Sequence, residues 1–343
     1  MTPRRILIIR PDRIGDVVLT TPLIRAVKKS FPGSFVGVMV GSNAAPLLLH
    51  NPNVDVLITD DPEGKDSGQR GFWRMVKFLR SHKFDTGLMP LPRERHAWMM
   101  LLAGISTRIG VGGKLFQIIT GTQSVSRNKY IPLRHEADYV MDLGRKIGVT
   151  DDTVLPELFP SDDEKNSALQ RLASKGISPT KPIVGINPSS GGSVPNWTLG
   201  RYIELIEVLA KRYQIVINIS NKDDEIEKML TPVLRPGIVT DRGDVRELIA
   251  LCASIDVLVS SSTGTMHIAA ALGVPTVSLF CPLPACSPQL WGPLGNRAEI
   301  ILPGLNYCQS QCPKDPKNCP LEDISVATVV QRVEKVLPER RSM

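Results

Sequence analysis

Strand-like apolar runs alternate with helix-length amphipathic stretches along both halves of this chain. An alternation of this kind predicts a parallel sheet with right-handed crossovers. Aromatic residues make up only 5% of the sequence, so Val, Ile, Leu and Ala must build the core, as buried parallel strands favour. In the first half we expect strands at 6–10, 34–41, 54–59, 84–90 and about 105–111, and helices at about 16–29, 70–81 and 94–103.

The alternation restarts after a linker that begins near residue 150. Pro156, Pro160 and the acidic run 162–164 lie there, and Ser161 is expected to cap a helix, with Glu164 completing a capping box. A last helix at about 322–337 is a candidate for crossing back to the first domain. The other elements expected in this half are strands at 182–187, 214–220, near 238, 255–261 and 274–280, and helices at about 199–212, 223–230, 244–253 and 265–272.

The predicted fold class is therefore α/β, with two Rossmann-like domains whose parallel sheets face each other across a cleft. We expect the first domain at 1–160, the second at 161–322 and the C-terminal helix in 323–343. Ligands of such sheets bind beyond the carboxyl ends of the strands. The loops at those ends are therefore where candidate site residues are sought.

The net positive charge of the chain comes entirely from its first half. Residues 1–160 contain 22 Lys and Arg against 15 Asp and Glu, a net charge of +7, whereas residues 161–343 contain 19 of each. This asymmetry indicates an anionic partner, such as a phosphorylated substrate or an acidic membrane surface, or else only a soluble basic domain. No apolar run approaches the roughly 20 residues that span a bilayer, and the N-terminus lacks a signal-peptide core, so we expect a cytoplasmic protein.

The loop after the first predicted strand holds a candidate catalytic carboxylate. It reads Arg10-Pro11-Asp12-Arg13-Ile14-Gly15-Asp16, and Asp16 is placed at the start of the following helix. Asp16 is either an N-cap or a general base that takes the proton of a hydroxyl nucleophile. The helix N-terminus and the neighbouring arginines predict a lowered pKa for Asp16.

Two loops in the second half combine hydroxyl side chains with glycines before a helix. The first is 187–193, which contains Ser189, Ser190 and Ser193, and the second is 260–267, which ends in His267. Backbone N–H groups in such loops can bind phosphate. Many turns have this composition, and a neutral structural His267 is the alternative, but two such loops in one domain favour a diphosphate.

Several signatures are absent from the sequence. No G-x-G-x-x-G follows a predicted strand and no G-x-x-x-x-G-K-[ST] occurs, which disfavours dinucleotide enzymes and P-loop NTPases. No Asp-x-Asp pair occurs, so a metal-bridged diphosphate is disfavoured, and the few scattered aromatics disfavour nucleic acid. The cluster Cys308, Cys312 and Cys319 is open to three interpretations, namely zinc, a redox-linked pair or an ordinary structural loop.

These residues resemble glycosyltransferase family 9, the bacterial ADP-heptose:lipopolysaccharide heptosyltransferases. The resemblance is carried by ILIIRPDRIGDVVLTTPLIRAVKKSFP, NPSSGGSVPNWTLGRYIELIEVL, SSSTGTMHIAAALGVPTVSLF and CQSQCPKDPKNCPLEDI, in this order along nearly the whole chain. It implies a GT-B fold, with the acceptor bound by the first domain and the nucleotide sugar by the second. It also implies an inverting transfer without a metal or other cofactor.

The resemblance also implies roles for single residues. Asp16 corresponds to the catalytic base, and the donor-binding positions are Ser189, Ser190, Ser193, Glu225, Gly243, Ser262, Thr263, Gly264 and His267. Among these, Glu225 is expected at the ribose hydroxyls and Gly243 at the adenine. Two positions depart from the family pattern: Pro195 replaces a Lys that neutralises the diphosphate, and Ser262 replaces an Asp expected to contact the heptose. Together these departures leave the formal charge of the pocket unchanged.

We therefore expect transfer of heptose from ADP-heptose to the inner core of lipopolysaccharide at the inner membrane surface, with no nucleic acid involved. Candidate acceptor-binding residues are Arg10, Arg13, Arg93, Arg95, Arg127 and Lys129, with Arg108, Lys114 and Arg134 adding positive charge. The alternatives are a GT-B enzyme that uses another nucleotide sugar, a GT-B-like sugar-nucleotide epimerase and a non-catalytic nucleotide-sugar or lipid-binding protein. A dinucleotide oxidoreductase is the most distant alternative.

Overall fold

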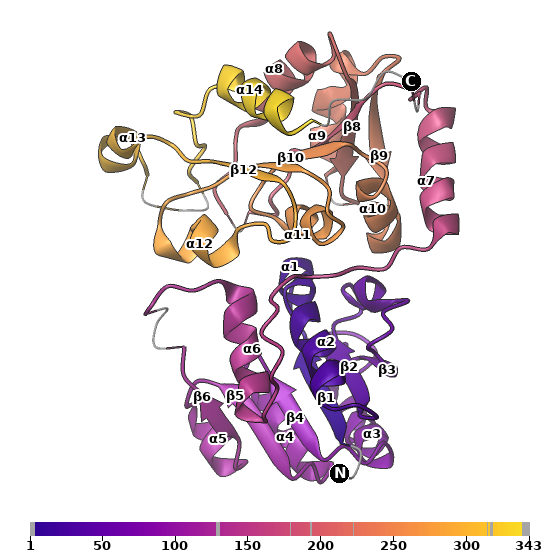
Figure 1. Ribbon diagram of the computed structural model, residues 1–343, viewed down its shortest axis with the longest axis vertical. Helices are drawn as coiled ribbons and strands as arrows, with labels where there is room; N and C mark the ends of the chain where they lie inside the picture. Colours follow the sequence, from indigo (N-terminus) through magenta and orange to yellow (C-terminus); the bar gives the residue numbers. More distant parts are fainter. Residues whose placement is uncertain are drawn as a thin grey trace. The chain divides into compact units, whose positions relative to one another are not determined.

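The computed structural model divides into two compact units, Met1–Phe159 and Pro160–Met343. It describes residues 4–127, 131–178, 180–192, 194–221, 223–313, 315 and 318–337. We describe each unit by itself. Figure 1 shows unit 1 from indigo to magenta and unit 2 from pink to yellow.

Unit 1 is a doubly wound α/β unit. Its described strands form a parallel sheet of six strands in the order β3-β2-β1-β4-β5-β6, which is the strand order of a Rossmann fold. The elements are β1 (Arg5–Arg10), α1 (Ile14–Val18), α2 (Thr21–Ser30), β2 (Phe35–Val40), η1 (Ala45–Leu48), β3 (Val56–Thr59), α3 (Gly68–Ser81), β4 (Thr86–Met89), α4 (Glu94–Leu102), β5 (Thr107–Val111), α5 (Leu115–Ile119), β6 (Gln123–Val125) and α6 (Glu136–Lys146).

The core of unit 1 follows from the alternation of side chains along β1. Leu7 and Ile9 are fully buried in one cluster with Met75 of α3 and Met99 and Met100 of α4. Side chains at the neighbouring positions of β1 point to the opposite face of the sheet. Helices α2 and α6 pack against each other and contact β2, β4 and β5. The sheet is therefore buried between helices, as a parallel sheet must be.

Unit 2 repeats this design. Its described strands form a second parallel sheet of six strands, in the order β12-β11-β10-β7-β8-β9. Counted from its own first strand, β7, this order is the same as in unit 1. The elements are α7 (Asp162–Ser174), β7 (Ile183–Asn187), α8 (Leu199–Leu209), β8 (Gln214–Ile219), α9 (Asp224–Leu230), η3 (Thr231–Val233), β9 (Ile238–Arg242), α10 (Val245–Cys252), β10 (Val257–Ser261), α11 (Gly264–Ala271), β11 (Thr276–Leu279), η4 (Pro284–Cys286), α12 (Pro288–Trp291), β12 (Ala298–Ile301), α13 (Leu305–Ser310) and α14 (Val326–Val336).

The last helix, α14, is part of unit 2. Val329, Val333 and Val336 are fully buried in the core cluster of that unit. The helix packs against α8 and β11, and Figure 1 shows it in yellow beside α8. Its apolar face is therefore covered by unit 2, whereas the sequence analysis considered a crossing to the first domain.

The predicted α/β class with Rossmann-like sheets is confirmed, and most element positions agree with the sequence analysis. The predicted cap of α7 is also confirmed, because Ser161 and Glu164 form the reciprocal hydrogen bonds of a capping box. The single helix expected at 16–29 is wrong. It is broken at Leu19 and Thr20, ahead of Pro22 in the first turn of α2, because proline suits a helix start but not a helix interior.

Candidate active site

Both sheets place the predicted site loops at their topological switch points. In unit 1, β1 lies between β2 and β4, and in unit 2, β7 lies between β8 and β10. In unit 1 the chain leaves β1 and β4 toward opposite sides of the sheet, and in unit 2 it does the same after β7 and β10. A crevice therefore opens at the carboxyl ends of these strands. Asp16 follows β1, and the two loops rich in hydroxyl groups follow β7 and β10.

Asp16 lies in the first turn of α1 and is held by a buried arginine. Nη2 of Arg10 donates hydrogen bonds to Oδ1 of Asp16 and to Oε1 of Glu136, the latter at 3.2 Å. The same atom lies 3.5 Å from Oδ2 of Asp12. Arg10 is 2% exposed, and the Asp16 side chain retains 16% exposure. Asp16 is thus fixed on one side and open to solvent on the other.

The predicted lowering of the Asp16 pKa is wrong. Burial raises the pKa of Asp16 above its usual value, and the negative charges of Asp12 and Glu136 act in the same direction. Arg10 acts in the opposite direction but does not outweigh them. Desolvation of a carboxylate disfavours its charged form, and the sequence could not reveal how deeply Asp16 is buried. A raised pKa makes Asp16 a stronger base than expected.

Glu136 belongs to this cluster, although the sequence analysis did not single it out. It is the first residue of α6, and its side chain is fully buried. Its Oε1 accepts from Nη2 of Arg127 at 2.8 Å as well as from Arg10. Glu136 is 126 positions from Arg10 in the chain. The only sequence signal was an acidic residue at the start of an amphipathic helix, which is common at helix N-termini.

The other predicted acceptor-binding residues differ in how far they are engaged within unit 1. Arg95 binds both oxygens of the buried Asp60 at 3.0 Å and donates to the carbonyl oxygen of Asp66 at 2.8 Å. In the described part of the chain, the exposed side chains of Arg13 and Arg93 form neither a hydrogen bond nor an ion pair. Lys129 lies outside the described residues.

Three further basic residues were expected to add charge. Arg108 donates to the carbonyl oxygen of Thr120 at 2.9 Å, next to the end of α5. Arg134 forms ion pairs with Asp138 and Asp142. Lys114 precedes α5 and is exposed. Arg108 and Arg134 therefore have partners within the unit.

In unit 2, the buried Asn187 connects the two loops that contain the hydroxyl groups. It is the last residue of β7, and its Nδ2 donates to the carbonyl oxygen of Ser189 at 2.7 Å and to Oγ1 of Thr263 at 3.5 Å. Its Oδ1 accepts from Nδ2 of Asn218 at 2.7 Å and from Oγ1 of Thr265 at 3.4 Å. Asn187 opened the predicted loop, but its connecting role could not be seen without the fold.

The loop after β7 turns through two glycines. Gly191 and Gly192 both have positive φ, at 60° and 67°, and a Cβ atom on either would meet no atom within 4 Å. Oγ of Ser190 donates to the carbonyl oxygen of Val194 at 3.4 Å. Pro195, the position that departs from the family pattern, is buried. Ser193 lies outside the described residues. The described part of the loop presents backbone with no side chain above it, which suits close approach of a phosphate.

The loop after β10 leads into α11. Thr263 is the N-cap of this helix in extended conformation, and Gly264 is its first residue. His267 lies in the first turn and is 5% exposed, and its N–H donates to the carbonyl oxygen of Thr263 at 3.3 Å. Ser262 is partly exposed just before the cap. The N-terminal N–H groups of α11 thus begin at the loop that Asn187 ties to β7, a suitable place for an anion.

Glu225 and Gly243 lie at the carboxyl ends of β8 and β9. Glu225 is exposed in the first turn of α9, and its carboxylate has no hydrogen bond or ion pair with another described residue. It is therefore available to hydroxyl donors. Gly243 precedes the capping box of α10, and a Cβ atom there would lie 2.6 Å from Cβ of Glu247. This close packing alone requires glycine.

The cysteine-rich segment supports the loop after β7. All six cysteines are free thiols, and among the described residues no group of three His, Cys, Asp or Glu side chains is arranged to hold a metal ion. Cys319 is buried against Tyr307, and its carbonyl oxygen accepts from the N–H of Asn196 at 3.2 Å. Nδ2 of Asn196 in turn donates to the carbonyl oxygen of Pro188 at 2.7 Å.

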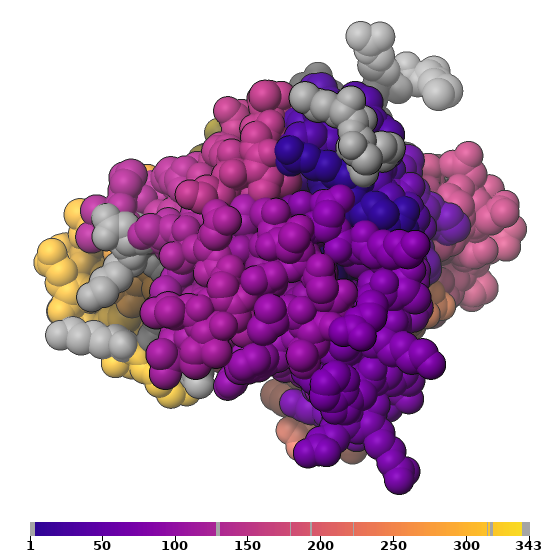
Figure 2. All heavy atoms as spheres, turned by 90° about the horizontal axis from the view of Figure 1, so that it is seen from below, coloured from indigo at the N-terminus to yellow at the C-terminus, as the bar shows by residue number. Residues whose placement is uncertain are grey.

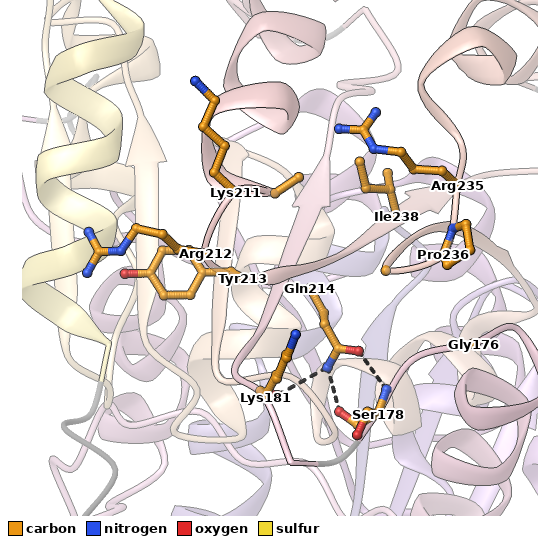
Figure 3. A pocket seen from close by; sticks show the side chains of 12 residues that line it. Gly176, Ser178, Lys181, Lys211, Arg212, Tyr213, Gln214, Arg235, Pro236 and Ile238 are labelled. Carbon is orange, nitrogen blue, oxygen red and sulfur yellow. Dashed lines mark hydrogen bonds between the residues drawn. The ribbon is translucent and has the colours of Figure 1, made fainter.

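A pocket of about 340 Å³ lies elsewhere in unit 2, at the amino-terminal ends of β8 and β9. Figure 3 shows Gln214 within it, bonded to Ser178 and Lys181. Gln214 accepts from the N–H of Ser178 at 2.6 Å and donates to the carbonyl oxygen of Lys181 at 3.3 Å. These bonds hold the segment after α7 against the sheet. Because ligands of such sheets bind at the carboxyl ends of the strands, this pocket is not the predicted donor site.

Comparison with known proteins identifies the family. The model of glycosyltransferase family 9 (heptosyltransferase) matches residues 72–321. The chain belongs to this family. It is a glycosyltransferase, and the epimerase, binding-protein and oxidoreductase alternatives are set aside.

Individual relatives of this family 9 enzyme cover nearly all of its length. Lipopolysaccharide heptosyltransferase 2 of Escherichia coli K12 is 26% identical over 311 residues, which cover 87% of each protein. The structure of a family 9 glycosyltransferase from Veillonella parvula matches with a TM-score of 0.84 over 97% of both chains, at 21% identity. That of the E. coli ADP-heptose lipopolysaccharide heptosyltransferase II matches with a TM-score of 0.78 over 97% of this chain and 98% of that one, at 22% identity. The predicted GT-B fold class is thereby confirmed.

We expect Asn187→Ala to loosen both loops of unit 2. The substitution leaves the polar groups around Asn187 without their partner, so the free energy of unfolding should fall by about 1–3 kcal/mol. Hydrogen exchange should become faster at 188–192 and 262–265. Asn296→Ala is the matched control, because Asn296 bonds Val274 and Thr276 at the amino-terminal end of β11. It should destabilise the protein without faster exchange in these loops; equal exchange in both variants would contradict the connecting role of Asn187.

Proposed function

We propose that this family 9 glycosyltransferase transfers heptose from ADP-heptose to the inner core of lipopolysaccharide, with inversion and without a metal. The observation that carries the proposal is Asp16, a partly exposed carboxylate with a raised pKa, held by Arg10 at the switch point of unit 1. The relatives named for heptosyl transfer to lipopolysaccharide support the choice of donor and acceptor.

Asp16 acts as the general base in this proposal. The acceptor hydroxyl attacks the anomeric carbon of the heptose, its proton passes to the Asp16 carboxylate, and the bond from the anomeric carbon to the diphosphate oxygen breaks. A single displacement of this kind inverts the anomeric configuration. The raised pKa helps because proton transfer is most effective when the pKa of the base is near the working pH.

Unit 2 stabilises the leaving ADP. Negative charge grows on the diphosphate as the bond breaks, and N–H groups of the loop at 188–192 and of the α11 N-terminus are fixed in place by Asn187. Such fixed donors often make the largest contribution to catalysis. Glu225 accepts hydrogen bonds from the ribose hydroxyls, and the backbone at Gly243 contacts the adenine. Ser262 and His267 lie beside the sugar.

The donor could also be a different nucleotide sugar, because Pro195 and Ser262 replace the charged residues of the family pattern. A buried proline cannot neutralise a phosphate, so backbone donors carry more of that role here. The proposal of a metal-independent reaction rests on the family resemblance and on the lack of an Asp-x-Asp pair in the sequence.

The central test measures transfer and donor binding separately. Asp16→Asn should lower kcat for transfer from ADP-heptose to a truncated core acceptor by about 100-fold or more, because the base is lost. Calorimetric titration should show that ADP binds this variant as tightly as it binds the wild type, without added metal. Asp142→Asn is the matched control, because Asp142 is a carboxylate of unit 1 that pairs with Arg134 and Arg145 rather than with Arg10, and it should retain most of the activity.

Three outcomes would contradict this proposal. Full activity of Asp16→Asn would exclude Asp16 as the base. Tighter binding of UDP than of ADP would leave the fold assignment intact but would reject ADP-heptose as the donor. Binding of ADP by the wild type without transfer of heptose to the core acceptor would reject this pairing of donor and acceptor.

We also propose that unit 1 binds the anionic membrane surface through α5. Leu115 and Ile118 are each 72% exposed, and Ile119 is 58% exposed. Exposed Lys114 precedes them, in the half of the chain that carries the whole net charge of +7. Apolar side chains beside a cation on a short helix suit an interface with anionic lipid.

No helix among the described residues is long and apolar enough to span a bilayer. Figure 2 shows a face of unit 1 made largely of the purple and magenta segments that follow β3.

Vesicle sedimentation tests this surface. The double substitution Leu115→Ser with Ile118→Ser should weaken binding to vesicles of phosphatidylglycerol and phosphatidylcholine by about tenfold or more, because two apolar side chains no longer enter the lipid. Added salt should weaken binding of the wild type. The matched control is Leu305→Ser in unit 2, where Leu305 is 74% exposed. If the control lowers binding equally, α5 is not the membrane surface.

A further inference from the structure

Glu136 is a buried carboxylate of which only one oxygen is paired within the described residues. Its side chain is fully buried, and while Oε1 accepts two hydrogen bonds, the buried Oε2 has no partner among the described residues. A buried acceptor without a partner costs free energy. Buried ion pairs are also often no more stable than apolar side chains of the same volume. Net stability alone therefore does not explain a carboxylate at this position.

The hydrogen bonds of Glu136 connect it to the candidate base through one nitrogen atom. Nη2 of Arg10 donates both to Oε1 of Glu136 and to Oδ1 of Asp16. Arg10 extends from the end of β1, is nearly fully buried, and its Nε and Nη1 have no partner among the described residues. Its guanidinium is therefore oriented by the carboxylates around Nη2. If Glu136 is lost, the position of Arg10 depends on Asp16 and Asp12 alone.

We infer that Glu136 is a positioning residue for Asp16, which acts through Arg10 to hold the carboxylate in place and to balance the positive charge beside it. This inference rests on the proposed role of Asp16 as the base. Arg10 alone would make the Asp16 carboxylate a weak base, because a cation in contact stabilises its charged form. Glu136 compensates part of that cation.

The charges around Asp16 in unit 1 determine whether loss of a neighbouring charge raises or lowers the pKa of Asp16. Arg10 on β1 lowers the pKa of Asp16, whereas Asp12 in the preceding loop and Glu136 on α6 raise it. Arg127 acts from beyond Glu136, to which it is bonded at 2.8 Å. The segment η1, which packs against α1, contains only Ala, Pro and Leu. Removing the charge of Glu136 must therefore lower the pKa of Asp16.

Glu136→Gln tests the inference, since glutamine keeps the size and the acceptor atom but not the charge. Activity of a base is lost as the pH falls through its pKa, so the acid limb of the kcat profile should move to lower pH in this variant. At neutral pH kcat should fall by about tenfold because the base is weaker and less well placed, with KM for ADP-heptose unchanged. Arg127→Gln should also move the acid limb, because it removes the second hydrogen-bond donor to Oε1 of Glu136.

The matched control is Asp142→Asn, which removes another carboxylate of α6 that is paired with arginines, Arg134 and Arg145. It should leave the acid limb where it is in the wild type. An acid limb that does not move in Glu136→Gln and Arg127→Gln, or that moves equally in Asp142→Asn, would overturn the inference. If one of the two cluster variants does not fold, the other decides alone.

A second readout does not depend on the reaction. The Asp16 carboxyl carbon can be followed by NMR in protein labelled with ¹³C at aspartate, with Asp16→Asn to assign the signal. Glu136→Gln should lower the midpoint of this titration. If the wild type transfers no heptose, the proposed function fails while this titration still tests the coupling. If the wild type is active and the midpoint does not move, the inference on Glu136 fails alone.

Discussion

The hydrogen bonds of Arg10 fix the geometry on which the site in unit 1 depends. A guanidinium at the end of a buried strand needs a counter-charge in contact with it, because an unpaired buried charge is strongly destabilising. Asp16 and Glu136 supply those acceptors from α1 and α6, two helices that lie far apart in the chain. Burial of Arg10 therefore draws these helices to one point. Asp16 is itself largely buried at this point, and its own burial raises its pKa against the opposing effect of Arg10.

Unit 2 uses the corresponding position for a different purpose. Asn187 ends β7 as Arg10 ends β1, and both are buried polar residues at the switch point of a sheet with the same strand order. An amide offers donors and acceptors without charge, so Asn187 can tie two loops together without repelling or neutralising an anion bound beside them. A guanidinium instead binds carboxylates strongly. The two units thus have one architecture, and the last residue of the first strand gives each its own chemistry.

The sequence allowed prediction of many features that depend on local pattern, although the amphipathic helix α6 was not among them. Hydrophobic periodicity located most buried strands, and the Ser161 capping box was visible as a motif. The edge strands β6 and β12 were not predicted, because they are short and partly exposed and have no continuous apolar run. Asp16 and the loops of unit 2 were found because a loop at a strand end is a local feature. Glu136 and the burial of Asp16 were not, because they depend on contacts between distant segments.

The distribution of charge in unit 1 separates residues that build the site from those free to attract a ligand. Some of the charges in this unit are shared, because Arg10 contacts three carboxylates and Glu136 binds two arginines. With 22 cations and 15 carboxylates in residues 1–160, at least seven cations have no carboxylate to themselves. Arg10 and Arg95 bind buried carboxylates, whereas Arg13 and Arg93 have exposed side chains without such a partner among the described residues. Arg13 and Arg93 therefore place part of the positive charge on the surface, where it can attract the phosphate groups of an acceptor over a Debye length of about 8 Å.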